Sequence, residues 1–151
     1  MKLTGLIIVV AGAFSLAGLS VAMPARNSTP HPATVSVART GLGRIIVNGQ
    51  GRTLYLFERD RRRGHSACSG ACAVYWPPLI THGKPIARGG ARQSLLGTIK
   101  RSNGARQVTY AGHPVYRFVQ DMKRGDTKGE GLTFFGGGWD ALSAAGKKIE
   151  R

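Results

Sequence analysis

Two copies of one short motif hold the residue types in this 151-residue sequence that could do chemistry. The motif reads Tyr-x-Phe-x-x-Asp, and its candidate ligand-binding residues are Tyr55, Phe57 and Asp60, then Tyr116, Phe118 and Asp121. Side chains at i and i+2 of a β-strand share a face, so each Tyr lies beside its Phe and each Asp falls in the turn beyond. Two interpretations follow. Either the aromatics pack in a core while the Asp accepts backbone N–H groups, or the two sets frame a groove for a ligand.

Hydrolytic catalysis would need two opposed carboxylates with separated pKa values, or a nucleophile beside a base. Asp60 and Asp121 are a possible carboxylate pair, and His113 is a possible base. Arginines adjoin the acids, which predicts low pKa values rather than the raised value of a general acid. The sequence therefore predicts no catalytic residues and no enzyme.

Cys68 and Cys72 are the only cysteines in the sequence. If the chain is exported, an even number of cysteines predicts a disulfide between them, and the short ring that it closes would stabilise the fold by about 2 kcal/mol. The alternative is a metal site that combines these thiolates with His65, His82 or His113. Because oxidation would already have paired the thiols, neither a metal nor any other cofactor is predicted.

The chain is strongly basic, with 22 Lys and Arg against 7 Asp and Glu and a formal charge of +15. Such a charge favours anionic partners, here an anionic envelope polymer or a membrane surface. The candidate anion-binding residues follow the two motifs at equivalent places and are Arg61, Arg62, Arg63, Lys123 and Arg124. The alternative is a set of solvated charged loops with no dedicated partner. No aromatic residues alternate with these clusters, so specific nucleic-acid binding is not predicted.

The N-terminal region reads as an export signal. Lys2 precedes an apolar run, and Ser20-Val-Ala22 offers the small residues that a signal peptidase reads. Residues 1–22 are therefore predicted to be a cleaved signal peptide, although a retained membrane anchor is the alternative. Residues 23–32 are predicted to form a flexible leader and residues 33–151 a single β-rich domain. The expected product is periplasmic or secreted, with no transmembrane segment after processing, and the sequence does not indicate its oligomeric state.

Short apolar runs separated by glycine turns predict strands rather than helices. Residues 47–70 match residues 108–131 at 8 of 24 positions with a constant offset of 61. Repeat 1 is placed at about 34–80 and repeat 2 at about 95–142. The predicted strands are Thr34–Arg39, Arg44–Val47 and Arg52–Glu58 in repeat 1, and Leu95–Lys100, Ala105–Tyr110 and His113–Val119 in repeat 2.

The predicted fold class is therefore mainly β, with two tandem three-stranded meander repeats packed as one small domain. At most one short helix is expected between them, within Ser66–Tyr75, because Trp76-Pro-Pro78 would end it. A repeated unit that cannot bury its apolar face alone must pack on its copy or extend the copy's sheet.

The sequence resembles a family of bacterial exported proteins, the secreted repeat of unknown function, whose members are described as predicted lipoproteins with a Tyr-x-aromatic-x-x-Asp motif. The resemblance runs from about Gly41 to Trp139. Its carriers are Gly51-Arg-Thr-Leu-Tyr-Leu-Phe-Glu-Arg-Asp60, Cys68-x-Gly-x-Cys-Ala73, Trp76-Pro-Pro78, Gln107-Val-Thr-Tyr110, Gly112-His-Pro114, Tyr116-x-Phe-x-x-Asp121, Gly125-Asp-Thr127 and Gly129-x-Gly131.

The resemblance implies a cell-envelope location and no established activity. Many relatives carry a lipid on a cysteine, and no cysteine lies near the predicted cleavage point here, so a released product is expected. The predicted function is an exported cell-envelope protein that serves as a non-catalytic binding or structural module with affinity for anionic envelope polymers. The alternative is a metal- or redox-associated periplasmic accessory protein.

Overall fold

The computed structural model describes residues 30–61 and 64–150. The predicted signal peptide lies outside the described residues, as does most of the predicted leader. The described chain is mainly β. Its strands are β1 (Thr34–Thr40), β2 (Gly43–Asn48), β3 (Tyr55–Phe57), β4 (Ile86–Ala87), β5 (Leu96–Lys100), β6 (Arg106–Tyr110), β7 (His113–Pro114), β8 (Leu132–Phe134) and β9 (Gly137–Ala141). Its helices are α1 (Ala71–Tyr75) and a single 3-10 turn, Gln93–Leu95.

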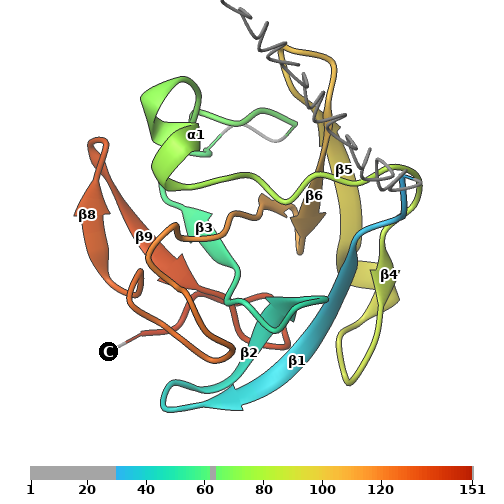
Figure 1. The fold of residues 1–151 in the computed structure, drawn as a ribbon, viewed down its shortest axis with the longest axis vertical. Coiled ribbons are helices and arrows are strands. Elements are labelled where there is room, and N and C mark those ends of the chain that lie inside the picture. The colour runs from blue at the N-terminus through green and yellow to red at the C-terminus, as the bar shows by residue number, and fades with distance from the viewer. Residues whose placement is uncertain (1–29, 62–63, 151) are drawn as a thin grey trace, which may run out of the picture.

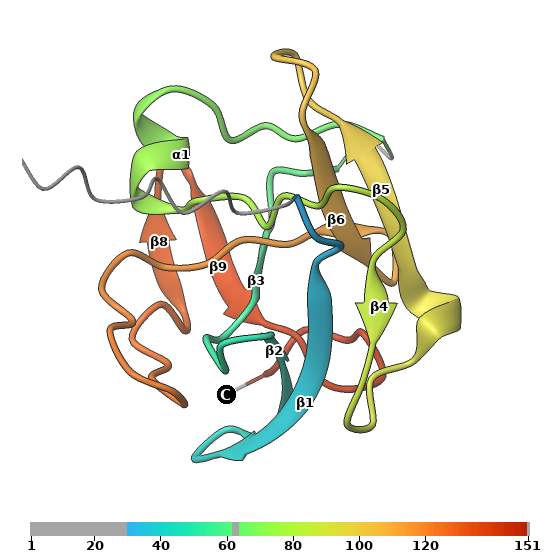
Figure 2. The same ribbon diagram turned by 45° about the vertical axis from the view of Figure 1, so that its right-hand side comes forward.

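The strands form three small sheets that surround the centre of the molecule (Figure 1). Their strand orders are β2-β1-β4, β5-β6-β7 and β3-β9-β8. Figure 2 shows the β5-β6 hairpin and the β8-β9 hairpin on opposite sides of β3. Repeat 1 thus supplies β1 and β2 to one sheet but sends β3 to a sheet made otherwise by repeat 2.

The third strand of each predicted meander is shorter than the sequence suggests. β7 pairs with β6 of its own repeat, whereas β3 and the residue Tyr116 after β7 pair with the other repeat. Tyr55, Leu56 and Phe57 of β3 lie opposite Ala141, Asp140 and Trp139 of β9. Tyr116, which follows β7, forms a bridge with Pro78 of repeat 1. Each repeat therefore extends the β-structure of its copy, which is one of the two arrangements that the repeat predicts.

This exchange is a continuous ladder on one side and a broken one on the other. β9 pairs with β3 over three residues, whereas the chain after Trp76 contributes isolated bridges at Pro78 and Ile80. Pro77-Pro78 follows Trp76 in repeat 1, as Asp140-Ala141 follows Trp139 in repeat 2. Proline has no N–H to donate to a ladder, so the pairing is interrupted at Pro77-Pro78 but complete at Asp140-Ala141.

β2 and β3 separate two apolar clusters, and their alternation sends neighbouring side chains to different clusters. Ile45 and Val47 of β2 face the first cluster together with Tyr55 and Phe57, and Ile46 faces the second. The first cluster contains the aromatic residues of both motifs, both tryptophans and the disulfide. The second contains aliphatic side chains and Tyr110. The run Ile45–Val47 is buried throughout because both of its faces are covered.

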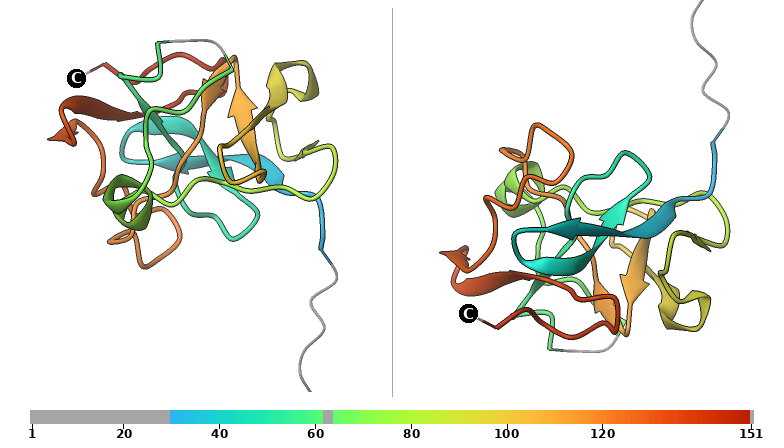
Figure 3. Two further views of the ribbon diagram at one scale, coloured as in Figure 1. Left: turned by 90° about the horizontal axis from the view of Figure 1, so that it is seen from above. Right: turned by 90° about the horizontal axis from the view of Figure 1, so that it is seen from below.

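The helix lies within the predicted segment Ser66–Tyr75, near the end of repeat 1. α1 begins only after Gly70, and the Trp76 N–H donates to the Cys72 carbonyl at 2.8 Å as the helix ends before Pro77. Within the part of the chain that the structure describes, no helix has the length and apolar character needed to cross a membrane. The beginning of β1 and the C-terminal end lie on opposite sides of the molecule (Figure 3).

Repeated glycines mark repeated backbone geometry. Gly51 and Gly112 have φ of 79° and 84°, and Gly64 and Gly125 have φ of 83° and 78°. These angles lie in the left-handed region, where a Cβ is costly, so the same turn in each repeat needs the same residue.

Candidate functional site

The two motif tyrosines meet in the middle of the first apolar cluster. The Tyr55 N–H donates to the Tyr116 carbonyl at 2.9 Å, and the Tyr116 N–H donates to the Tyr55 carbonyl at 3.0 Å. Both side chains are fully buried. Because each residue makes the contact that its counterpart makes, the two repeats are related here by an approximate twofold axis.

Each tyrosine hydroxyl is paired with the aspartate of the other repeat. Tyr55 donates to Asp121 Oδ2 and Tyr116 donates to Asp60 Oδ2, both at 2.6 Å. The remaining oxygen of each carboxylate accepts a backbone N–H, from Ala67 at 2.6 Å and from its counterpart Lys128 at 2.9 Å. The motif therefore joins a core aromatic of one repeat to a turn of the other.

The environment raises the pKa of both carboxyls, which corrects the expectation of low values. Burial raises the pKa of Asp60 and Asp121, and it outweighs the tyrosine hydroxyls and backbone N–H groups that lower it. The adjoining arginines do not control these groups. Arg61 is exposed, and Arg124 lies against Gly51 and Gln50.

Burial also raises the pKa of both tyrosines far above the ordinary value, and the nearby carboxylates raise it further. Both hydroxyls are thus kept protonated at all physiological pH values. They serve as hydrogen-bond donors to the carboxylates rather than as phenolate nucleophiles or bases.

Four aromatic rings stack across the repeat boundary. The central pair is Trp76 and Trp139, with ring centroids 3.9 Å apart and planes 4° apart. Phe118 stacks on the outer face of Trp76 at 4.3 Å, and Phe57 stacks on Trp139 at 4.1 Å. All four side chains are buried. The motif phenylalanines therefore also contact the tryptophan of the opposite repeat, and the stack fixes the two repeats against each other.

An open cleft of about 750 Å³ lies beside the first aspartate. Its polar lining includes Asp60, Arg61 and His113, with Lys148 ion-paired to Glu58 at 2.8 Å. Burial lowers the pKa of His113, and the Asp60 carboxylate opposes that effect.

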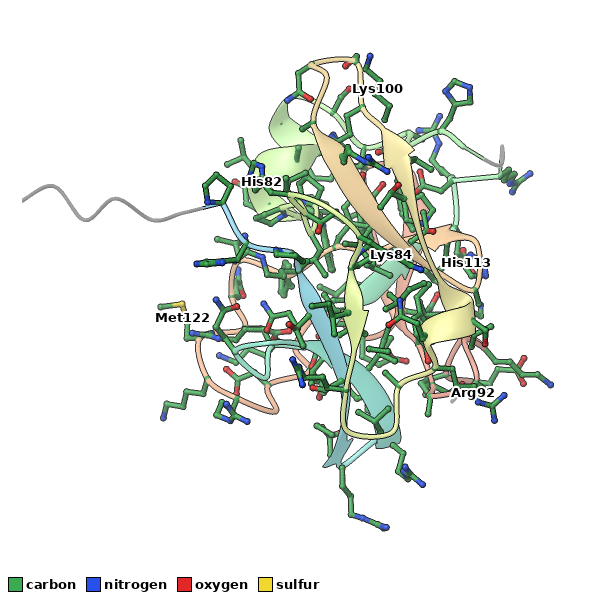
Figure 4. The ribbon with its side chains drawn as sticks, turned by 90° about the vertical axis from the view of Figure 1, so that its right-hand side faces the viewer. His82, Lys84, Arg92, Lys100, His113 and Met122 are labelled. Carbon is green, nitrogen blue, oxygen red and sulfur yellow. A yellow bond between two sulfur atoms is a disulfide. The ribbon has the colours of Figure 1, made fainter. Side chains whose placement is uncertain are left out.

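A smaller cleft of about 290 Å³ lies beside the second aspartate, and its lining corresponds to that of the first. Asp121, Phe118 and Met122 take the places of Asp60, Phe57 and Arg61, and Arg52 takes the place of His113. Figure 4 shows His113 and Met122 on opposite sides of the molecule. The repeat thus builds two related clefts with different chemistry.

Two segments of the chain, residues 36–80 and 97–143, match the family model described as a secreted repeat of unknown function. The chain belongs to this family. The two matched segments begin 61 residues apart, which is the offset that relates the two motifs. No curated protein and no solved structure shows significant similarity to the chain.

In this secreted-repeat protein the cysteines form a disulfide between Cys68 and Cys72, with Cα atoms 5.3 Å apart. The thiols that the metal alternative requires are thus joined to each other. Among the described residues, no three His, Cys, Asp or Glu side chains are grouped in a way that would hold a metal ion.

The described anion-binding candidates of the secreted-repeat protein have different surroundings. Arg61 is exposed and lines the larger cleft. Arg124 donates to the Gln50 carbonyl at 3.3 Å, so its side chain holds the Asn48–Arg52 turn. Lys123 is exposed, and its backbone N–H is bonded to Asp126. Arg62 and Arg63 lie outside the described residues.

Sequence reasoning missed Arg101. Its guanidinium donates to Gln107 Oε1 and the Cys68 carbonyl, both at 2.6 Å, and to Ser66 Oγ at 2.9 Å. These bonds join the end of the β5-β6 hairpin to the disulfide loop. Arg101 lies outside the repeated motif, and its acceptors Ser66 and Cys68 are 35 and 33 residues away, so no local pattern in this single sequence singles it out.

Proposed function

We propose that this protein is an exported, non-catalytic module that binds anionic polymers of the cell envelope. The observation that carries the proposal is the distribution of charge. Fifteen of the seventeen lysines and arginines within residues 30–61 and 64–150 are exposed. Three of the seven carboxylates of the chain are buried, namely Asp121, Glu130 and Asp140. The surface is therefore more positive than the composition alone indicates.

A surface of this kind attracts polyanions through its summed field rather than through one contact. Each phosphate or sulfate that it neutralises releases a condensed counterion, so the affinity depends steeply on salt. The predicted export would place the surface among envelope polymers, in the periplasm or outside the cell.

The state of the motif residues supports a role without catalysis. Their aromatic side chains are buried, and the hydroxyl and carboxylate groups that chemistry would use are bonded to each other. We propose that the motif holds the two repeats together and that the ligand binds elsewhere on the surface. The metal-associated alternative receives no comparable support, since paired cysteines offer no thiolate to a metal. A redox role would use this disulfide as its oxidised form.

The test measures binding of the secreted form to polyphosphate by isothermal titration calorimetry at several salt concentrations, with dextran as the uncharged control. We expect the affinity for polyphosphate to fall at least about tenfold between 50 and 200 mM salt, and we expect no binding to dextran. Replacing Arg61, Arg62 and Arg63 together by glutamine should reduce the salt slope. Equal binding to both polymers, or an affinity independent of salt, would contradict the proposal.

A further inference from the structure

One pocket outside the motif clefts has a lining without carboxylates. It has a volume of about 370 Å³ and lies where the β5-β6 hairpin meets the disulfide loop. Figure 4 shows Lys100 at the outer end of this hairpin, well away from Lys84. The lining consists of cationic and hydroxyl side chains with one imidazole, namely His65, Ser66, Ser69, Lys100, Arg101 and Ser102.

Arg101 is held in place before any ligand arrives. Its acceptor Gln107 is fully buried and is itself fixed by donating to the Val115 carbonyl at 3.1 Å. The second fixed acceptor is the carbonyl of Cys68, which belongs to the disulfide. A guanidinium has more N–H groups than its three acceptors here engage, so Arg101 retains donor capacity in the pocket. A positioned arginine loses little side-chain freedom when it binds an anion.

The pocket belongs to one half of the molecule only. At the repeat offset His65 corresponds to Asp126 and Ser69 to Glu130, so the equivalent place in repeat 2 has acidic residues. The hairpin also differs, because β5 and β6 are joined from Lys100 to Arg106, whereas β1 and β2 are joined by the shorter turn from Thr40 to Gly43. The motif and its symmetry therefore do not account for this cluster.

We propose that this pocket binds a single tetrahedral oxyanion, the phosphate or sulfate group of an anionic polymer. Hydroxyl, ammonium and guanidinium donors surround the space, and an oxyanion with three or more acceptor oxygens accepts from several of them at once. A planar carboxylate offers two oxygens and matches this arrangement less well. The inference rests on the proposed function, since it names the chemical group that the cationic surface holds and where.

The experiment compares Lys100→Gln with Lys84→Gln, because both remove one positive charge from an exposed lysine and only the first lies in the pocket. Inorganic phosphate, inorganic sulfate and acetate are titrated into the nitrogen-15-labelled protein, and the backbone amides are followed by NMR. We expect phosphate and sulfate, but not acetate, to shift the amides of residues 65–69 and 100–102. Lys100→Gln should weaken phosphate binding about tenfold, and Lys84→Gln should leave it within about twofold.

Binding of polyphosphate and of dextran sulfate to the same variants distinguishes the polymer source and the two proposals. If Lys100→Gln and Lys84→Gln weaken the binding of every anion equally, the summed positive charge of the surface binds the polymer and the pocket inference is wrong. If phosphate shifts the pocket amides but no polymer binds, the pocket inference stands for a free ion and the proposed function is wrong. Arg101→Gln would also remove the hydrogen bond to the Cys68 carbonyl, so Ser69→Ala is used as the second pocket variant. An unchanged phosphate affinity in both Lys100→Gln and Ser69→Ala would overturn the site.

Discussion

The Tyr55 hydroxyl donates to the Asp121 carboxylate at 2.6 Å across a sequence separation of 66 residues, in a buried position. The same hydroxyl accepts the Gly129 N–H at 3.2 Å. Its counterpart Tyr116 donates to Asp60, which is only half-buried, and also contacts Ser66 Oγ at 2.7 Å. Equivalent bonds therefore lie in unequal surroundings.

This inequality predicts unequal effects of removing the hydroxyls. Tyr55→Phe leaves a buried carboxylate without its side-chain donor and should lower the free energy of unfolding by about 2 to 3 kcal/mol. Tyr116→Phe should cost about 1 kcal/mol, because water can reach Asp60. Urea unfolding of both variants is the measurement. Equal costs, or a larger cost for Tyr116→Phe, would contradict the difference in burial.

The raised pKa of Asp121 predicts a stability term with a definite sign. A folded-state pKa above the unfolded value means that the folded protein binds the proton more tightly. This contribution is fully present below the unfolded-state pKa of about 3.9, and it is lost as the pH rises through the folded-state pKa.

The stability of the wild type relative to Asp121→Asn should therefore decrease as the pH rises from about 3 to about 7. Taking the difference removes the opposite contributions of Glu58 and Asp126, whose pKa values are lowered. The measurement is the free energy of unfolding of both proteins across this range. If the wild type instead gains stability relative to Asp121→Asn as the pH rises, the folded protein favours the ionised Asp121 carboxylate and the prediction is wrong.

The packing around Gly129 predicts a sharp steric effect. A Cβ added there would lie 2.8 Å from Cη2 of Trp76 and 2.9 Å from Cζ of Tyr55. Gly129→Ala should cost about 1 to 3 kcal/mol, since neither ring can move without disturbing the stack. Gly41→Ala is the matched control, because an added Cβ there meets nothing within 4 Å, and its effect should stay within about 0.5 kcal/mol. Thermal unfolding of the pair checks both values.

The disulfide closes a short loop, so its removal predicts a local effect. Replacing Cys68 and Cys72 together by alanine should cost about 2 kcal/mol by the loop-entropy relation. Amide exchange should accelerate in residues 65–76, while the amides of β1 and β2 keep their protection relative to global unfolding. Uniform loss of protection over the whole domain would mean that the bridge supports the fold globally.

Local signals in the sequence located most of the strands. The Asn48-Gly49 turn is observed, with Asn48 Oδ1 accepting the N–H groups of Gln50 and Arg52, both at 3.0 Å. The β1-β2 and β5-β6 hairpins lie where the alternation of apolar residues predicts them. Such features depend on neighbouring residues and are therefore readable from one sequence.

The local β8-β9 hairpin was not among the predicted strands, and the other features that escaped prediction depend on residues far apart in the chain. The motif shows that Tyr55 and Asp60 share a repeat, but it does not show that each pairs with the opposite copy. Burial by residues distant in the sequence raises the pKa of Asp60, whereas the adjacent arginines, which the sequence shows directly, predicted a low pKa. Trp76 and Trp139 are recognisable as repeat markers, yet their stacking requires the folded arrangement of the two halves.

The exchange of partners between the repeats has the form of an isologous subunit interface, in which residue i contacts j and j contacts i. A single chain here makes the reciprocal contacts that two half-length chains would make in a symmetric dimer. Two molecules that exchanged halves would keep every tyrosine–aspartate bond and every ring of the stack. We therefore expect the segment between the repeats, residues 81–94, to determine whether the chain closes on itself or on a second copy, and shortening that segment should favour a domain-swapped dimer.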